Sequence, residues 1–520
     1  MILNKYLYRK HNDYIVKKDI KDIDFNKLKD SNDYHNKTNS SLDDITWNDL
    51  NMNNVYAKIN YTVTSPGEEC LYSWLKNPLD NEKEFEERKD FISRFTNNEK
   101  INKKLRTNLS KIKYCKYNFR KVIEGNFLVH KFILALFIMF STINLSIIGY
   151  TIFIRELLFL PISILMIIFA FNILIHFKFN DKYGEQLEVL NYILRLLSFA
   201  NKNKELLKQF TPDLVNRLDK INDTLMKISK KGSVIFRIEG FDFIADYFNI
   251  AFLVKEINFL MISRQMHEHK KEIIEIYNLI GELDAVLSIC RYRKELNYYC
   301  EPNIEDNEEE IKISDMYHPL IENPTPNSIS TIKDIAITGS NMSGKSTFLR
   351  TIGLNVLFAQ SICTSLSKEH RTRFYRLLTS ISLNDDILES KSYFLMEAEA
   401  IKRMVNLKDD NYHSLILIDE IFKGTNPIER LSASIELLNL LSLGNTKVFV
   451  ATHDLQILSK LVKYDYYYFT ENVTKESLEF DYKIRKGVTS TRNAIKILEF
   501  IKYPEDIITK INKRISVMEV

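Results

Sequence analysis

The sequence predicts an α/β domain with a parallel sheet in its C-terminal part, preceded by an all-α region that a two-helix transmembrane hairpin interrupts. Three observations lead to this fold class. From about Ile311 onward, short apolar runs typical of strands alternate with helical runs, which is the pattern of a parallel sheet with crossover helices. Before that point, apolar residues recur mostly at helical spacing. Between the helical segments lie two uncharged runs, each long enough to cross a bilayer.

Composition excludes several classes of protein. At roughly 100–200 residues per domain, 520 residues correspond to about three domains. The net charge of +4 excludes a globally basic chain, so any contact with nucleic acid must come from a local patch. Hydrophobic residues make up 45% and charged residues 27%, which excludes general disorder. The five cysteines are scattered without a CxxC pair, which favours packing residues over a disulfide framework or a zinc site.

The residues around the two uncharged runs predict five further parts. Residues 1–45 are polar and predict a loosely packed start without a signal peptide. Residues 46–121 and 180–300 are predicted to be helical, the latter with a seam that suits a coiled coil or the core face of a bundle. Residues 301–310 are acidic and predict a solvated linker. The α/β domain with a C-terminal helical tail follows at 311–520.

The two uncharged runs predict a transmembrane hairpin at 132–177. They comprise residues 132–154 and 157–175, or about 34 and 28 Å of helix, close to one hydrocarbon core each. The alternative is a helical hairpin buried in a soluble core. Lysines at 131 and 178 lie outside the two runs, so both termini and the soluble domains are expected in the cytoplasm.

A basic stretch precedes the hairpin. Residues 101–121 hold eight lysines and arginines and no acidic residue. Three interpretations remain open, which are a solvated helix face, a contact with anionic lipid headgroups and a contact with the DNA backbone.

A phosphate-binding motif follows the first strand of the α/β region. Residues 339–346, GSNMSGKS, match G-x-x-x-x-G-K-[ST] and lie between a predicted strand and a predicted helix. Backbone N–H groups of such a loop surround phosphates, Lys345 is expected at the β/γ-phosphates, and the Ser346 hydroxyl is expected on Mg²⁺. The motif predicts an α/β P-loop NTPase domain that binds ATP through Gly339, Ser340, Asn341, Met342, Ser343, Gly344, Lys345, Ser346 and Thr347.

Three further residues complete the expected site. The apolar run 415–418 ends in Asp419, a second candidate ligand of Mg²⁺, and Glu420, a candidate to orient or deprotonate the attacking water. The run 448–452 ends beside His453, which is expected to sense or polarise the γ-phosphate.

Several segments resemble the MutS family of DNA mismatch-repair ATPases. These are TGSNMSGKST at 338–347, DEIFKGTN at 419–426, ATH at 451–453, ISLNDDILESKSYF at 381–394 with Glu397 beyond it, and MYHPL at 316–320. The resemblance implies an ABC-type ATPase that acts as a homodimer. It also implies that Ser392 completes, in trans, the nucleotide site of the partner subunit.

The resemblance extends to the helical region but is incomplete. Residues 64–79 and 279–302 look like the outgoing and returning parts of the family's lever domain. Only about 45 polar residues precede the lever, so we expect a membrane-anchored member without the mismatch-recognition domain. Ser340 and Ser343 replace the family's usual proline and glycine, and Tyr393 replaces a threonine.

Two hypotheses of function follow. The first is a Mg²⁺-dependent dimeric ATPase that couples ATP binding and hydrolysis to binding of duplex, branched or mismatched DNA at the membrane, with no small-molecule substrate besides ATP. The second is a membrane-anchored mechanical or scaffold ATPase that acts on a protein or membrane partner without DNA. A transporter is a third alternative, disfavoured because two spans per chain form a thin translocation path.

Overall fold

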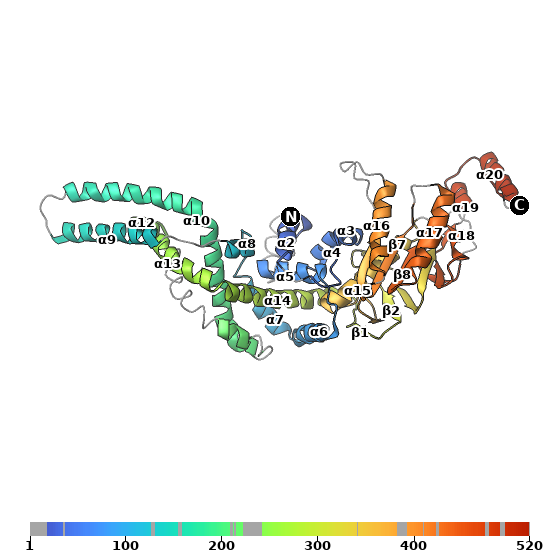
Figure 1. Cartoon of the computed structure of the whole chain (residues 1–520), viewed down its shortest axis with the longest axis horizontal. Coiled ribbons are helices and arrows are strands. Elements are labelled where there is room, and N and C mark those ends of the chain that lie inside the picture. The colour runs from blue at the N-terminus through green and yellow to red at the C-terminus, as the bar shows by residue number, and fades with distance from the viewer. Residues whose placement is uncertain are drawn as a thin grey trace, which may run out of the picture.

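The computed structural model describes residues 18–34, 37–125, 131–153, 159–208, 212, 215–221, 242–340, 342–381, 393–408, 410–422, 426–473, 478–488 and 494–518. Structural statements below concern these residues. Helices fill the first part of the chain and strands with helices fill the second (Figure 1).

The helical part comprises η1 (Ile20–Asp22), α2 (Phe25–Asn32), α3 (Asp44–Asp49), α4 (Met52–Ile59), α5 (Ser65–Lys76), α6 (Glu82–Thr96), α7 (Glu99–Leu109), α8 (Phe119–Glu124), α9 (Lys131–Phe153), α10 (Phe159–Lys208), α12 (Asp242–Phe252), α13 (Val254–Glu268) and α14 (Lys270–Glu295).

The α/β part comprises β1 (Asn303–Ile304), β2 (Ile311–Met316), β3 (Asn327–Thr331), β4 (Asp334–Thr338), α15 (Lys345–Ile362), β5 (Glu369–Thr372), β6 (Arg376–Ser380), α16 (Tyr393–Leu407), β7 (Ser414–Asp419), α17 (Pro427–Leu441), β8 (Thr446–Ala451), α18 (Leu455–Leu458), β9 (Tyr464–Tyr468), β10 (Glu471–Val473), β11 (Leu478–Phe480), β12 (Arg485–Lys486), α19 (Ala494–Phe500) and α20 (Glu505–Met518).

The main sheet is largely parallel, as the alternating pattern predicts. Its strand order is β12-β9-β4-β8-β7-β6, and β12 alone runs antiparallel to its neighbour. Every residue of β4 and β7 is buried, because helices cover both faces. Successive residues of β7 point to opposite faces of the sheet. Leu415 and Leu417 join the core cluster that includes α15, whereas Ile416 and Ile418 join the cluster with α16 and α17.

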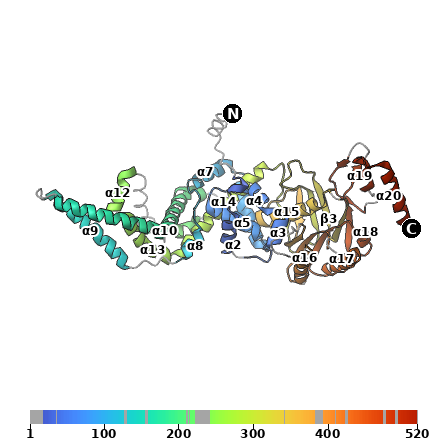
Figure 2. The same cartoon turned by 90° about the horizontal axis from the view of Figure 1, so that it is seen from above.

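Helix α14 forms the axis of the helical part. It runs from the α12–α13 region toward the α/β domain in both views (Figures 1 and 2) and packs closely on α5. A Cβ atom on Gly281 of α14 would lie 2.6 Å from the carbonyl oxygen of Pro66, so glycine permits this close approach. Asp284, on the same helix, accepts hydrogen bonds at Oδ2 from the backbone nitrogens of Val63 and Thr64, both at 2.9 Å.

Two segments are more ordered than composition suggests. In residues 18–45, predicted to be loosely packed, Ile23, Leu28 and Leu42 are buried in the core. Ser31 of α2 also donates to Glu69 of α5 at 2.6 Å. Within 301–310, predicted to be a solvated linker, β1 pairs with β5 and Ile304 is buried. A few apolar residues among many polar ones anchor each segment, and average composition does not reveal them.

The second apolar run and the start of the predicted helical region form one helix. Helix α10 spans 50 residues from Phe159 to Lys208, so it crosses the boundary expected between the hairpin and the region 180–300. Figures 1 and 2 show α9 and the apolar part of α10 projecting at the end of the molecule opposite to the α/β domain, and in Figure 1 the second half of α10 turns across that direction.

Both projecting helices are apolar and exposed. Their most apolar windows have mean hydropathies of 2.2 and 2.1, and only 11% of each window is buried. Length and composition are therefore sufficient to cross a membrane. This exposure argues against the alternative of a hairpin buried in a soluble core.

Polar contacts fix the hairpin to α12 and α13. The side-chain amides of Asn144 and Asn172 both donate to the carbonyl oxygen of Ala251, at 2.6 and 2.8 Å. His176 contacts the buried carboxylate of Glu256 at 2.6 Å. Because these hydrogen bonds are directional, they fix the position of the hairpin relative to α12 and α13.

Helix α3 connects the helical part to two elements of the α/β domain. The carboxylate of Asp49 accepts from Thr379 Oγ1 at 2.7 Å and from the backbone nitrogen of Ile381 at 2.9 Å, at the end of β6. Its carbonyl oxygen accepts from Arg350 Nε of α15 at 2.8 Å. Displacement of α15 or β6 therefore strains buried hydrogen bonds of α3.

The buried Asp284 gives stability a specific pH dependence. Burial raises its pKa from 3.8 to about 6, so the folded state holds this proton between those pH values while the unfolded state has released it. The contribution of Asp284 to stability therefore falls as pH rises through that window, by roughly 3 kcal/mol in total.

The Asp284→Asn variant should lose this pH dependence, because an amide does not titrate. Its amide oxygen can still accept the hydrogen bonds that Oδ2 accepts in the natural chain. We expect the midpoint of thermal unfolding, compared between pH 4.5 and 7.5, to fall less for Asp284→Asn than for the natural chain. Glu87→Gln, at an exposed carboxylate of α6, is the matched control. Parallel pH profiles of all three proteins would contradict the assignment.

Candidate functional site

The site is built around the loop between β4 and α15. The strand ends at Thr338, and Gly339 and Gly344 bound the turn with φ of 146° and 109°. A Cβ atom on Gly339 would lie 2.8 Å from the carbonyl oxygen of Phe469, so this position requires glycine for both its conformation and its space. The turn also places the start of α15, with its unsatisfied backbone N–H groups, at the cavity that the loop borders.

Serines hold the loop where the resembled family has proline and glycine. Ser343 Oγ donates to the carbonyl oxygen of Ser340 at 2.8 Å, and Ser340 Oγ donates to Glu471 Oε2 at 2.7 Å. The two replacements thus supply hydrogen bonds across the loop and to β10. The ammonium group of Lys345 lies over the loop, donating to the carbonyl oxygens of Gly339 and Ser340 at 2.9 and 2.8 Å.

Two oxygen-bearing side chains meet at the start of α15. Ser346 Oγ donates to Asp419 Oδ2, at the end of β7. Asp419 Oδ1 is buried and has no hydrogen-bond partner among the described residues. A hydroxyl and a carboxylate with one uncommitted oxygen fit Mg²⁺, which uses one or two protein carboxylates and completes its shell with phosphate and water. The described residues contain no cluster of three His, Cys, Asp or Glu side chains for a metal, so a protein-only cage is not formed there.

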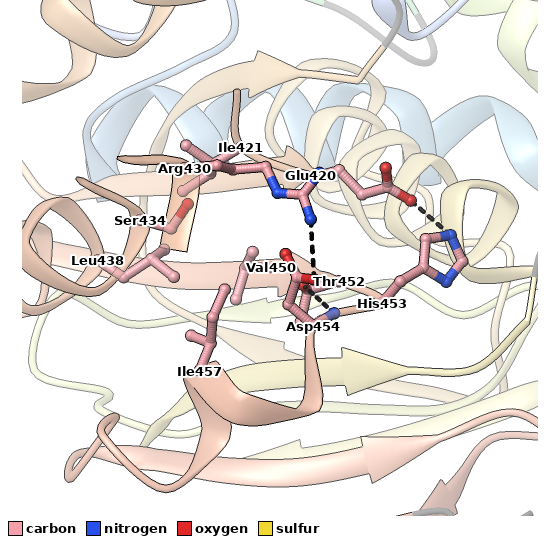
Figure 3. A pocket seen from close by; sticks show the side chains of 10 residues that line it. All are labelled: Glu420, Ile421, Arg430, Ser434, Leu438, Val450, Thr452, His453, Asp454 and Ile457. Atoms are coloured by element: carbon pink, nitrogen blue, oxygen red, sulfur yellow. Dashed lines mark hydrogen bonds and ion pairs between the residues drawn. The ribbon is translucent and has the colours of Figure 1, made fainter. Parts of the chain in front are cut away.

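Glu420 and His453 form a chain of contacts back to the loop (Figure 3). Glu420 adopts a left-handed φ of 63°, which turns its side chain away from the strand direction. His453 Nε2 lies 2.6 Å from Glu420 Oε1, and His453 Nδ1 lies 2.8 Å from the carbonyl oxygen of Gly339.

The contacts of His453 define where protons must be. A carbonyl oxygen only accepts, so Nδ1 carries a hydrogen. The other ring nitrogen, Nε2, lies 2.6 Å from Glu420 Oε1. The imidazole therefore connects the loop carbonyl to the Glu420 carboxyl group and fixes the orientation of that group.

A small cavity lies behind this pair. Its volume is about 70 Å³, and Figure 3 shows Arg430 and Asp454 among its lining residues. Arg430 Nη2 contacts Asp454 Oδ1 at 3.1 Å. This ion pair joins the start of α17 to the segment after His453, so it supports the position of the histidine from the side away from the loop.

A larger cavity opens in front of the loop. It has a volume of about 620 Å³, in the range of small-molecule sites. Lys345, Ser346, Asp419 and Glu420 line one side. His318 of the MYHPL segment lines another side, and burial, with a smaller contribution from Arg350, lowers its pKa to about 4, so this imidazole is neutral at physiological pH.

Sequence reasoning missed several residues of this cavity. Tyr482, Asn327, Pro324 and Phe469 line it, and Asn327 Nδ2 donates to the carbonyl oxygen of Tyr482 at 2.9 Å. The apolar and aromatic surfaces of Tyr482, Pro324 and Phe469 suit a flat base. Asn327 begins β3, the other three lie in connecting segments, and none belongs to a motif, so only the folded chain identifies them.

Some expected residues lie outside the described residues. These are Asn341 and Ser392, together with Asp385 and Asp386 of the 381–394 segment. Just beyond that segment, Phe394 of α16 contacts Phe422, with ring centroids 5.3 Å apart. Glu397 is buried on the same helix.

Comparisons with known proteins agree on one family. The model "MutS domain III" matches residues 38–290, and "MutS domain V" matches residues 335–519. The chain is 30% identical over 267 residues to the DNA mismatch repair protein MutS of Petrotoga mobilis, covering 49% of this chain and 32% of that protein.

Two further relatives show similar values. The Endonuclease MutS2 of Streptococcus uberis is 30% identical over 268 residues, and the DNA mismatch repair protein MutS of Thermotoga maritima is 29% identical over 272 residues. Each match covers 50% of this chain and 33% of the relative, so the chain matches about a third of the length of these proteins.

Proposed function

The chain belongs to the MutS family, and from this premise we propose that it is a Mg²⁺-dependent dimeric ATPase that couples ATP binding and hydrolysis to DNA binding at the cytoplasmic face of a membrane. The observation that carries the proposal is the convergence of Lys345, Ser346, Asp419 and Glu420 on one cavity beside the loop 339–344.

The nucleotide part of the proposal assigns a role to each converging residue. The backbone N–H groups of the loop and of the start of α15 bind phosphate, and Lys345 supplies a positive charge. Ser346 and Asp419 would hold Mg²⁺, which when bound neutralises charge on the β- and γ-phosphates. Tyr482 and the neutral His318 form the side of the cavity that suits the base.

The hydrolytic part rests on the contact between Glu420 and His453. Glu420 is placed to accept a proton from the attacking water, and a positioned base of this kind contributes about 10²–10⁴-fold to a rate. His453 orients the carboxylate through the 2.6 Å contact and is itself held by the carbonyl oxygen of Gly339. The loop that binds phosphate thereby also positions the base.

The DNA part rests on the relatives. Two of them carry DNA mismatch repair in their names, and the matched residues include most of the helical part. We propose recognition through the phosphate backbone or DNA shape, which needs no side chain inserted between bases. Backbone binding is steeply salt-dependent.

The membrane part rests on the exposed hairpin. Helix α9 and the first half of α10 present large side chains such as Phe132, Leu145 and Met166 to the surroundings, exposed by 75%, 57% and 69%. A continuous apolar surface of this kind requires a membrane or a protein cover. Basic flanks favour a membrane with the α/β domain on the cytoplasmic side.

Mixed variants test the homodimer and the role of Ser392 in trans. Ser392→Ala and Lys345→Ala should each be inactive alone. A mixture should regain ATPase activity, because an intact Lys345 site on one chain is completed by Ser392 from the other. Hydrolysis by co-purified mixed dimers measures this. No activity above the separate variants would argue against completion in trans.

The DNA coupling is tested by ATPase rate. The detergent-solubilised protein is titrated with homoduplex, mismatched duplex and four-way junction DNA at low and physiological salt. A change of rate that persists at physiological salt with one DNA form would support the coupling. Normal turnover that no DNA form alters would favour the second candidate, a mechanical or scaffold ATPase, for which the exposed hairpin is the supporting observation.

A further inference from the structure

The basic stretch 101–121 divides into buried and exposed cations. Arg106 donates to the carbonyl oxygen of Tyr61 at 2.9 Å, and Arg120 is buried and contacts Asn278. These two arginines hold the helical part together. The lysines of the stretch are exposed instead. The exposed lysines therefore supply the positive charge that a ligand can reach. They lie along α7 and along the segment that follows α7.

A cavity beside the middle of this stretch collects cations from α10 and from the segment after α7. It lies between α7 and α10 and has a volume of about 260 Å³. Lys111 from the segment after α7 lines it together with Arg195 and Lys202 of α10. The remaining polar lining consists of Asn108, Ser198 and Asn203, while Ile112 and Phe199 supply an apolar part, and no carboxylate of the described residues lines the cavity. Three cations without an acid among these lining residues match a single anionic group.

Hydrogen bonds fix the donors before any ligand is bound. Arg195 Nη1 donates to the carbonyl oxygen of Ile112 at 2.9 Å, while its Nε is buried and has no hydrogen-bond partner among the described residues. Asn203 is buried, and its Oδ1 accepts from Asn108 Nδ2 at 2.7 Å. Lys111 Nζ donates to Asn108 Oδ1 at 3.2 Å. Because these side chains are already ordered, less entropy is lost when an anion binds.

The position of the cavity favours a nucleic acid over a membrane. Figures 1 and 2 show α7 on the side of α10 away from the projecting hairpin. The exposed lysines of α7 therefore extend the positive surface away from the hairpin, where a nucleic acid can follow it and lipid headgroups around the hairpin do not. An extended polyanion reaches both the cavity and the exposed lysines beside it, whereas a free phosphate gains only the cavity.

We propose that the cavity between α7 and α10 seats a backbone phosphate of DNA, with Arg195, Lys111 and Lys202 as its cationic contacts. This inference rests on the proposed DNA-binding function and adds a contact site in the helical part, away from the nucleotide site. The bound strand then continues along the exposed lysines of 101–121. The contact reads no base, so it strengthens binding of all sequences equally.

Salt-dependent binding of a fluorescent 30-base-pair duplex tests the site. Each backbone contact contributes about 0.9 to the slope of log affinity against log salt. The double variant Lys111→Gln/Lys202→Gln should therefore reduce that slope by about two relative to the natural chain. Lys58→Gln/Lys83→Gln removes two exposed lysines from α4 and α6 and is the matched control, whose slope should not change. Thermal unfolding checks that all proteins are folded.

The alternatives have distinct outcomes. An unchanged slope in the Lys111→Gln/Lys202→Gln variant, with DNA still bound, would overturn the phosphate site alone. An unchanged DNA slope with weaker flotation on phosphatidylserine vesicles would assign the cavity to lipid and also overturn it. If the natural chain binds no DNA at either low or physiological salt, the DNA part of the proposed function would be overturned instead.

Discussion

Replacing Lys345 by alanine should lower ATP affinity by about 100-fold or more. Hydrogen bonds between charged partners contribute about 1.5–3 kcal/mol each, and the lysine ammonium makes more than one such contact with a nucleotide phosphate chain. Lys345 is nearly buried and its Nζ lies over the loop between Gly339 and Ser340. In the variant, water has little access to this position and therefore compensates poorly for the lost positive charge. Titration calorimetry with a slowly hydrolysed ATP analogue measures the loss.

The control for this variant is a lysine of the same domain. Lys333, before β4, is exposed and makes only a 3.6 Å ion pair with Asp465. Lys333→Ala should bind ATP like the natural chain. Because Lys345 also donates to the loop, its removal could loosen the loop itself, and the thermal unfolding midpoint separates that effect from the loss of a phosphate contact. Unchanged affinity of Lys345→Ala would remove the phosphate-binding role of this loop.

Glu420→Gln should bind ATP normally and hydrolyse it about 10²–10⁴-fold more slowly. The amide keeps the shape of the carboxyl group, and its N–H can donate to His453 Nε2, so a contact with the imidazole is preserved. An amide cannot take a proton from water. The expected result is thus a loss of the chemical step without a loss of binding.

Single-turnover hydrolysis and nucleotide affinity, measured on the same preparation, separate these two steps. Glu436→Gln, at an exposed position of α17, is the matched control and should turn over at the natural rate. Normal turnover by Glu420→Gln would exclude Glu420 as the base. Equal losses of affinity and rate would instead indicate that Glu420 supports the fold of the site.

The parts of the site that a sequence identifies are those fixed by local chemistry. A glycine-bounded turn before a helix uses residues that are close in the chain, so residues 339–347 form a recognisable motif. The ends of the buried strands β7 and β8, at Asp419 and near His453, are recognisable because each follows a short apolar run. The contact between Glu420 and His453 follows from the parallel pairing of those two strands, which alternating apolar runs predict.

Other features depend on long-range packing and were not predictable. Tyr482 follows β11 and Asn327 begins β3, and the hydrogen bond from the Asn327 side chain to the Tyr482 carbonyl oxygen leaves no pattern in the sequence. The contact of Asp49 with β6 and α15 joins residues some 300 positions apart. One helix, α10, spans the apolar run and the start of the region 180–300, because hydropathy changes there while helical spacing does not.

The unbroken course of α10 has a mechanical consequence. Figure 1 shows that the helix changes direction sharply after its apolar part, so its second half runs across the direction of the hairpin. Polar contacts at Asn172 and His176 hold the apolar part against α12 and α13. In the proposed membrane-anchored dimer, the second half of α10 therefore acts as a lever arm, and a sideways displacement of its far end by the helical part turns the hairpin about its own axis.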